Sequence, residues 1–266
     1  MKLYRYWQVE RAKVRVNGDE FELTCYGGSD FSDADAGAKA REKIEKVRRK
    51  IAGDAHAFDE YEVAIREETL RVIHEKAVIT RTRYGAQVLN VEDLMIMDVD
   101  RPPFAFADLF RRRETARDKA RILELVRKVA RTEPWQGWGL RVYETFRGIR
   151  LIVLGRSFDP TGDETETLMR SFHTDGLYVR LCRKQACFRA RLTPKPGRMK
   201  LKAYKVRFPR DEAEDREFKA WLKEYEYASR EYSVCKLVEQ IGPGEPPEAV
   251  RVHDQVSGVD LGLKLA

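Results

Sequence analysis

Short runs of alternating apolar and polar residues recur along the chain, separated by longer stretches with helical spacing. Two alternating runs flank Asn-Gly-Asp-Glu near the N-terminus, which predicts a β-hairpin within the first 26 residues. The apolar runs at 86–90 and 94–99 predict two neighbouring strands. The runs at 138–145 and 149–155 predict a second hairpin that turns at Phe-Arg-Gly.

Apolar positions spaced by three or four residues predict several helices. After the turn in "GGSDFSDAD", Ser32 is expected to cap the first helix, which Gly53 ends. That motif superficially resembles the signature of one nucleotidyltransferase class, but a turn and a helix cap are favoured. Further helices are predicted at 111–131, at 163–173 and after Pro209. The chain beyond Gly242 is expected to be an extended arm.

These elements predict an α+β fold in which helices pack on mixed or antiparallel sheets. We expect an N-terminal α/β subregion at 1–80, a catalytic-like core with basic strands at 81–210, and a C-terminal helix and arm at 211–266. All three together also fit a single domain of 266 residues.

Composition favours a reduced, cytoplasmic protein without a membrane span. No run of eighteen apolar residues occurs, and the polar, alternating N-terminus is unlike a signal peptide. The four cysteines are too scattered to predict a disulfide framework. Cys182 and Cys187, with Cys25 or Cys235 and His173, give only a poor zinc pattern, so zinc is not expected and buried thiols are favoured.

The apolar run at 94–99 leads directly into two acids. Because alternate side chains of a strand share a face, Asp98 and Asp100 are expected to lie side by side, with Val99 in the core. Two adjacent carboxylates repel each other unless a cation or a proton lies between them. The pair therefore suggests a site for Mg²⁺ or Mn²⁺, although acids at a strand end are also common as simple polar termini.

Residues 176–210 contain 12 Lys or Arg and no Asp or Glu, within a chain whose net charge is +7. One sign of charge over so long a stretch predicts phosphate binding. Alternation predicts strands at 177–182, 187–192 and 201–208. The residues expected to bind nucleic acid are Arg180, Arg189, Arg191, Arg198, Lys200, Lys202, Lys205 and Arg207, with Tyr178, Phe188 and Tyr204 available for stacking on bases.

Together these motifs resemble the catalytic core of archaeo-eukaryotic primases and primase-polymerases, over roughly residues 84–196. The resemblance implies that Asp98 and Asp100 bind the metals and that Asp175, or else Asp159, is a third acid. Arg150 stands where the family has a histidine that contacts the incoming triphosphate. This departure either preserves phosphate binding or marks a site without catalysis. Lys195 and Arg183 are further candidates for nucleotide phosphates.

The implied activity is two-metal transfer of nucleotides from a nucleoside triphosphate to a nucleic-acid hydroxyl. Two other functions fit the same residues. One is a DNA- or RNA-binding protein without chemistry, in which the Asp pair is structural. The other is a metal-dependent nuclease, which is less favoured because Arg-Pro-Pro follows the acids in place of a nearby lysine or glutamate.

Overall fold

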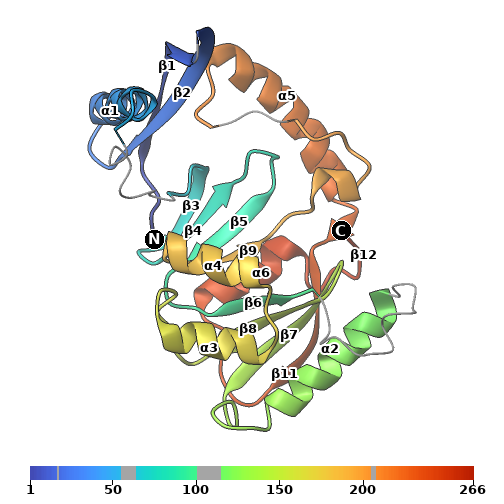
Figure 1. Ribbon diagram of the computed structural model, residues 1–266. Coiled ribbons are helices and arrows are strands. Elements are labelled where there is room, and N and C mark those ends of the chain that lie inside the picture. The colour runs from blue at the N-terminus through green and yellow to red at the C-terminus, as the bar shows by residue number, and fades with distance from the viewer. Residues whose placement is uncertain (17, 55–63, 101–114, 205–207) are drawn as a thin grey trace.

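A computed structural model describes residues 1–16, 18–54, 64–100, 115–204 and 208–266. Within these residues the protein is a mixed α+β fold of antiparallel sheets and packed helices, as the sequence predicts (Figure 1). None of the helices in the described parts is long and apolar enough to cross a bilayer.

Two four-stranded antiparallel sheets form the body of the protein. Buried aliphatic side chains from both sheets join one core. The first sheet has the order β3 (Glu68–His74), β4 (Ala77–Arg81), β5 (Gln87–Val91), β9 (Phe188–Arg191), and the second has the order β11 (Cys235–Ile241), β7 (Gly139–Thr145), β8 (Ile149–Leu154), β6 (Ile96–Val99). β3, β4 and β5 follow one another as hairpins in the first sheet, whereas only β7 and β8 form a hairpin in the second.

The edge strands β6 and β9 meet where the two sheets join. The hydroxyl of Tyr178 donates to the carbonyl of Ile96 in β6 at 2.9 Å, and it accepts from the N–H of Arg189 in β9 at 3.2 Å. The prediction that β5 and β6 are neighbouring strands is wrong. β5 already pairs with β4 and β9 on its two sides, so the chain crosses to the other sheet.

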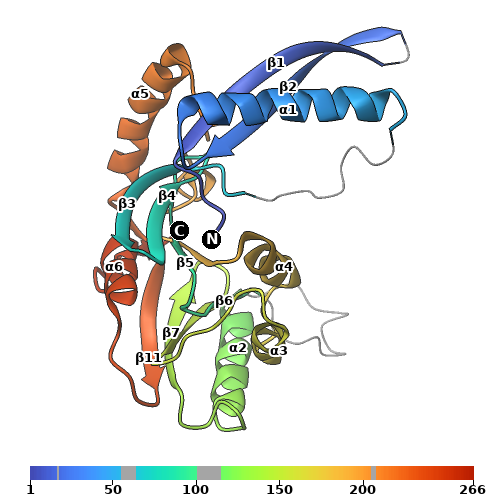
Figure 2. The same cartoon turned by 90° about the vertical axis from the view of Figure 1, so that its left-hand side faces the viewer.

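A long hairpin of β1 (Tyr6–Val16) and β2 (Asp19–Ser29) lies at one end of the molecule with α1 (Asp33–Ile51) along it (Figure 2). The predicted cap is confirmed, since Ser32 Oγ accepts from the N–H of Asp35 at 3.1 Å. Helix and hairpin approach closely at Gly27. A Cβ on Gly27 would lie 1.9 Å from the carbonyl oxygen of Ala36, so only glycine fits there.

We therefore expect Gly27→Ala to lower the free energy of unfolding by about 1–3 kcal/mol, because the clash is with backbone that cannot rotate away. Gly37→Ala in the same helix is the matched control. Its Cβ meets only the flexible end of Arg41 at 3.4 Å, so the helix should gain up to about 1 kcal/mol. Urea denaturation of both variants measures the difference, and equal stabilities would contradict the packing described.

The basic segment begins as a helix, which corrects the strand predicted at 177–182. α4 (Gly176–Gln185) starts at Asp175, whose Oδ1 accepts from the N–H groups of Leu177 and Tyr178, and it ends at Ala186 in the left-handed conformation. β9 confirms the second predicted strand. The third is wrong for 201–204, which form no strand, and 205–207 lie outside the described residues.

The other predicted helices are present as α2 (Thr115–Val129), α3 (Asp163–Ser171) and α5 (Glu212–Ser229), while 111–114 lie outside the described residues. The extended arm after Gly242 is a wrong prediction. That region contains α6 (Glu248–Ser257), whose residues Val250, Val252 and His253 are buried against the sheets. The remaining elements are η2 (Pro196–Arg198), β10 (Tyr232–Ser233) and β12 (Lys264–Leu265).

Candidate functional site

Asp98 and Arg150 face each other across β6 and β8 and form a two-point ion pair. Arg150 Nε donates to Asp98 Oδ1 at 2.8 Å, and Nη2 donates to Oδ2 at 3.0 Å. Arg150 is 2% exposed, whereas the Asp98 side chain is 31% exposed. Burial acts to raise the pKa of Asp98, but the charge and hydrogen bonds of Arg150 outweigh it and hold that pKa below its usual range.

The remaining contacts of Arg150 fix its guanidinium inside the protein. Nη1 donates to the carbonyl of Arg191 at 3.0 Å and lies 3.2 Å from Nε2 of His253. The sequence placed Arg150 where the resembled family binds a triphosphate. In this structure four of its five N–H groups are directed to Asp98, Arg191 and His253, and the side chain is 2% exposed, so an external phosphate could reach it only if these contacts were opened.

Asp98, Asp100 and Asp175 form what we call the acidic cluster. The N–H of Asp175 donates to the carbonyl of Asp98 at 3.3 Å, which places the start of α4 beside the end of β6. Burial raises the pKa of Asp100, and the negative charges of Asp98 and Asp175 raise it further. Asp159, the alternative third acid, instead accepts hydrogen bonds from Thr161 in a turn.

Beside these acids, four basic side chains form what we call the basic cluster. Burial lowers the pKa of Arg198 to about 10, and the charges of Arg191 and Arg147 lower it further, while Asp100 acts against them. The pKa of Lys195 is lowered for the same reasons. No carboxylate in the described residues forms an ion pair with any of the four. The members are Arg147, Arg191, Lys195 and Arg198.

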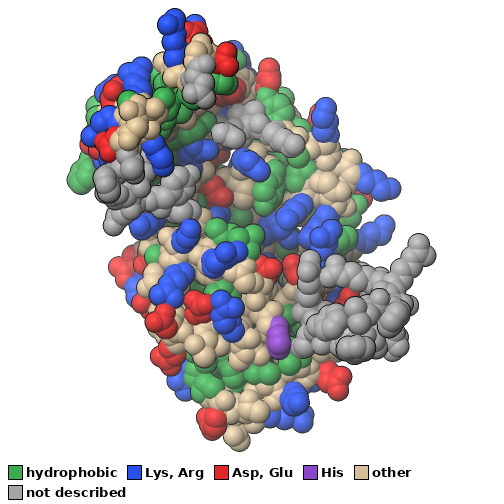
Figure 3. Space-filling model, viewed as in Figure 1, with side chains coloured by type: hydrophobic (Ala, Val, Ile, Leu, Met, Phe, Trp, Pro, Cys, Tyr) green, Lys and Arg blue, Asp and Glu red, His purple; other side chains and the backbone are tan. Residues whose placement is uncertain are grey.

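Local structure presents these cations together. Arg147 lies in the β7–β8 turn, Arg191 ends β9, and the proline-containing loop at 193–198 carries the other two. The Arg198 guanidinium stacks over the ring of Phe146 at 4.5 Å, and Arg191 Nε is buried without an acceptor among the described residues. Figure 3 shows Lys and Arg side chains gathered in the middle of one face, next to a small group of acidic ones.

Several other residues that the sequence nominated have partners within the protein, and the rest are exposed or lie outside the described residues. Arg183 pairs with Asp163 at 2.7 Å, and Arg189 pairs with Glu67 at 2.6 Å. Phe188 is fully buried, and the hydroxyl of Tyr178 joins the two sheets. Arg180, Lys200 and Lys202 are exposed, Tyr204 bonds to Glu217 beside Trp221, and Lys205 and Arg207 lie outside the described residues.

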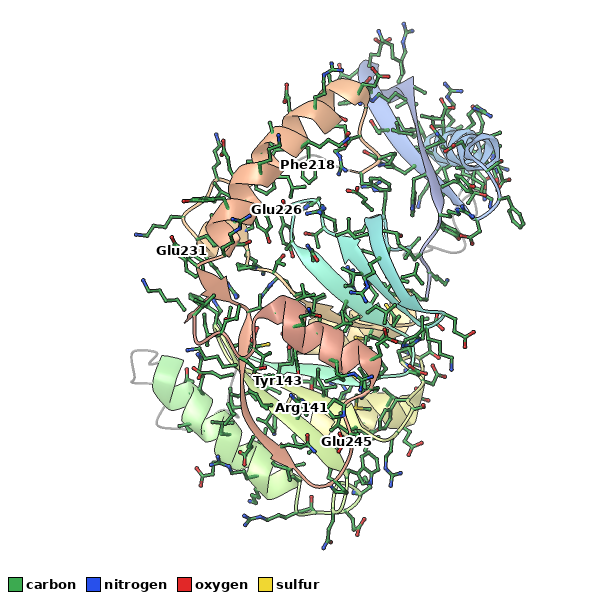
Figure 4. All side chains as sticks on the ribbon, turned by 180° about the vertical axis from the view of Figure 1, so that it is seen from behind. Arg141, Tyr143, Phe218, Glu226, Glu231 and Glu245 are labelled. Carbon is green, nitrogen blue, oxygen red and sulfur yellow. The ribbon has the colours of Figure 1, made fainter. Side chains whose placement is uncertain are left out.

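A buried network lies behind Arg150, where β7 and α6 meet, and it was not predicted from the sequence (Figure 4). Asp254 accepts from Tyr143 Oη at 2.7 Å and from Arg141 Nη2 at 2.6 Å, and it lies 2.9 Å from Nδ1 of His253. The available signal was "EAVRVHDQVSG", where apolar residues at helical spacing precede a glycine. It was obscured by the preceding Gly-Pro-rich stretch.

The described residues include no group of three or more His, Cys, Asp or Glu side chains arranged to hold a metal. Mg²⁺, however, commonly takes only one or two protein carboxylates and completes its shell with water and substrate phosphates. Asp100 makes no hydrogen bond or ion pair with a described residue, and like charges raise its pKa. The acidic cluster therefore fits a metal shared with a bound phosphate, and not a cage of protein ligands alone.

Of the cysteines in the weak zinc pattern, Cys182, Cys187 and Cys235 are buried, whereas Cys25 is half-buried in β2. Burial raises the pKa of Cys182 to about 12 and those of Cys187 and Cys235 to about 11, which keeps these thiols protonated at neutral pH. Comparisons with known proteins give no match to a family model, a curated protein or a solved structure.

Asp100 provides a prediction about pH. Because its pKa is raised in the folded protein, ionisation destabilises the fold as the pH rises through the usual carboxyl range. Asp100→Asn should therefore increase stability at pH 7 by up to about 1 kcal/mol after allowance for solvent screening. The gain should shrink as the pH falls toward 4. Thermal unfolding at several pH values measures it, and a gain that does not depend on pH would contradict the repulsion.

Proposed function

We propose that the protein binds a nucleoside triphosphate between the acidic and basic clusters and transfers the nucleotide to a hydroxyl of a nucleic acid, with release of pyrophosphate. One observation carries the proposal: four basic side chains without carboxylate partners in the described residues lie together, and three of them, Arg191, Lys195 and Arg198, interact electrostatically with Asp100, whose neighbours are also acids. A polyphosphate with a divalent cation complements both groups at once, because the anion meets the basic side chains and the cation meets the acids.

The positive charges of the basic cluster repel one another, and this repulsion favours the binding of a phosphate. Arg191, Arg147 and Arg198 each lower the pKa of Lys195, so an anion placed among them relieves an existing electrostatic cost. The stacked guanidinium of Arg198 and the proline-stiffened Lys195 would hold phosphate oxygens with little further loss of side-chain entropy. These two residues are therefore assigned to the phosphates in place of the enclosed Arg150.

The acidic cluster is assigned to Mg²⁺ or Mn²⁺. Asp100 would bind the metal with the lone pairs of Asp98 that Arg150 leaves free, and Asp175 contributes negative charge from the start of α4. When bound, the metal lowers the pKa of an attacking hydroxyl and neutralises charge on the phosphates. Exposed Arg180, Lys200 and Lys202 are proposed to contact the nucleic-acid backbone.

Nucleotide incorporation tests the proposal. The protein is incubated with single-stranded DNA, with and without primer, labelled ribo- or deoxynucleotides, and Mg²⁺ or Mn²⁺. We expect metal-dependent products that disappear in Asp100→Asn and decrease strongly in Arg198→Ala. Asp260→Asn and Lys223→Ala are the matched controls, because both side chains are exposed and remote in sequence from either cluster. Absence of products under all these conditions would overturn the proposed activity.

Binding of nucleic acid without chemistry is the second candidate, and the engagement of both Asp98 oxygens by Arg150 favours it. It predicts salt-sensitive binding that Arg198→Ala weakens and Asp100→Asn leaves unchanged or strengthens. The incorporation assay also detects the nuclease alternative, since a nuclease would shorten the labelled strand in a metal-dependent way.

A further inference from the structure

Arg150 is held from behind by His253, the end of a buried chain of polar groups. His253 is fully buried on α6, with Nε2 3.2 Å from Arg150 Nη1 and Nδ1 2.9 Å from Asp254 Oδ1. Arg141 and Tyr143 both donate to Asp254 and also contact each other at 2.7 Å. These side chains connect α6 to the guanidinium that holds Asp98.

The contacts define the proton positions on His253. A carboxylate only accepts, so the hydrogen of the ring is on Nδ1, toward Asp254. Nε2 then carries a lone pair toward Arg150 Nη1, which only donates. Burial lowers the pKa of His253, and the charge of Arg150 lowers it further, which keeps the ring neutral in this orientation. The imidazole thus joins Asp254 to Arg150 through two hydrogen bonds, one donated by Nδ1 and one accepted by Nε2.

Burying such a network of polar groups costs free energy. Polar and charged groups lose hydration on burial, and a well-packed apolar set of similar volume is often as stable or more stable. Nη1 of the buried Arg150 carries two hydrogens, for which the carbonyl of Arg191 and Nε2 of His253 are the two acceptors. Arg141 and Tyr143 both hold Asp254 at the Nδ1 end of the imidazole, and Arg150 at 3.2 Å and Sγ of Cys235 at 3.9 Å lie at the Nε2 end.

We propose that His253 is a positioning residue for the acidic cluster. By accepting from Arg150 Nη1 it fixes the guanidinium, which in turn fixes both oxygens of Asp98 and leaves the free lone pairs of that carboxylate beside Asp100. This inference rests on the proposed metal and nucleotide site, and it assigns control of that site to a helix near the C-terminal end of the chain.

Two substitutions distinguish the role of Nε2 of His253 from the role of Nδ1. His253→Gln places an amide oxygen the same number of bonds from Cβ as Nε2, so it keeps an acceptor for Arg150. His253→Asn reaches only the position of Nδ1, so it keeps a donor for Asp254 and loses the acceptor. Both remove a buried ring, and loss of packing alone should therefore affect them similarly.

The first measurement is Mn²⁺ affinity, obtained by titration of the folded variants without substrate. We expect His253→Asn to weaken it about 10-fold or more, in the range usual for residues that orient metal ligands, and His253→Gln to stay close to wild type. Equal affinities in wild type, Asn and Gln variants would overturn the positioning role, as would equal losses in the two variants.

A second measurement does not depend on the proposed function. The Nε–H resonance of Arg150, assigned by its absence in Arg150→Lys, reports how firmly the guanidinium is held. It should exchange slowly with water in wild type and His253→Gln and rapidly in His253→Asn. If wild type fails to bind Mn²⁺ while this pattern holds, the proposed function fails and His253 still positions Arg150. Equal exchange in both variants would overturn the positioning itself.

Discussion

Asp98→Ala is expected to lower the free energy of unfolding by about 3–5 kcal/mol, the usual cost of leaving a buried charge without its partner. Arg150 is 2% exposed, and Asp98 supplies its only ion pair among the described residues. Removing Arg150 as well removes the uncompensated charge. The double variant Asp98→Ala/Arg150→Met should therefore recover much of the loss, and urea denaturation of the single and double variants measures the coupling.

The pH dependence has a defined sign. The pKa of Asp98 is lowered in the folded protein, so its stabilising contribution is present above the usual carboxyl range and is lost as the pH falls through the folded pKa. The advantage of wild type over the double variant should thus decline below about pH 4. Additive single-variant losses at pH 7 would show that the pair is not coupled. Because Asp98→Ala also destabilises the fold, Asp100→Asn is the cleaner test of activity.

Gly148→Ala is expected to abolish function by displacing the end of β6. A Cβ at this turn position would lie 2.1 Å from the carbonyl oxygen of Val99 and 2.8 Å from Cα of Asp100, both backbone atoms. The strand must then move, and the acidic cluster moves with it. We expect loss of nucleotide incorporation and a destabilisation of about 1–3 kcal/mol, measured by the incorporation assay and by denaturation.

Gly197→Ala is the control for this variant. Gly197 lies between Lys195 and Arg198 at the same site, and an added Cβ would meet no atom within 4 Å. It should keep wild-type activity. If Gly148→Ala incorporates nucleotides as well as Gly197→Ala does, the position of Asp100 does not matter for the reaction. The absence of a side chain at Gly148 thus allows the end of β6 to approach the β7–β8 turn.

Elements fixed by local interactions could be predicted from the sequence. The hairpins of β1–β2 and β7–β8 follow from alternation on both sides of a short turn. The start of α1 follows from the oxygen of Ser32 three residues before Asp35. In each case the residues that decide the structure are near one another in the chain, so one sequence contains the necessary information.

α4 shows where that reasoning fails. Its residues alternate well enough to predict a strand, yet Val179 and Cys182 are also three apart and form the buried side of a helix. A run of ten residues is compatible both with the two-residue period of a strand and with the 3.6-residue period of a helix. The cap at Asp175 decides for the helix. The sequence analysis treated Asp175 only as a possible third acid and missed this second role.

The candidate site could be predicted only in part. Acids at the end of an apolar run and a long acid-free segment are visible in the sequence, and the structure brings Asp100 near Lys195 and Arg198. The burial of Arg150 between Asp98 and His253 was not predictable, because these residues come from three elements separated by 52 and 103 positions. Only the meeting of the two sheets brings them together.

The junction of β6 and β9 has a thermodynamic consequence. Asp98 lies in one sheet and Asp100 directly follows its edge strand β6, whereas Arg191 ends β9 at the edge of the other sheet and the loop after it carries Lys195 and Arg198. A ligand that binds both clusters spans the two layers, so its binding free energy also opposes their separation. A saturating ligand should therefore hold the two sheets together reversibly. The angle between the sheets then depends on the bound ligand as well as on the packing of the protein.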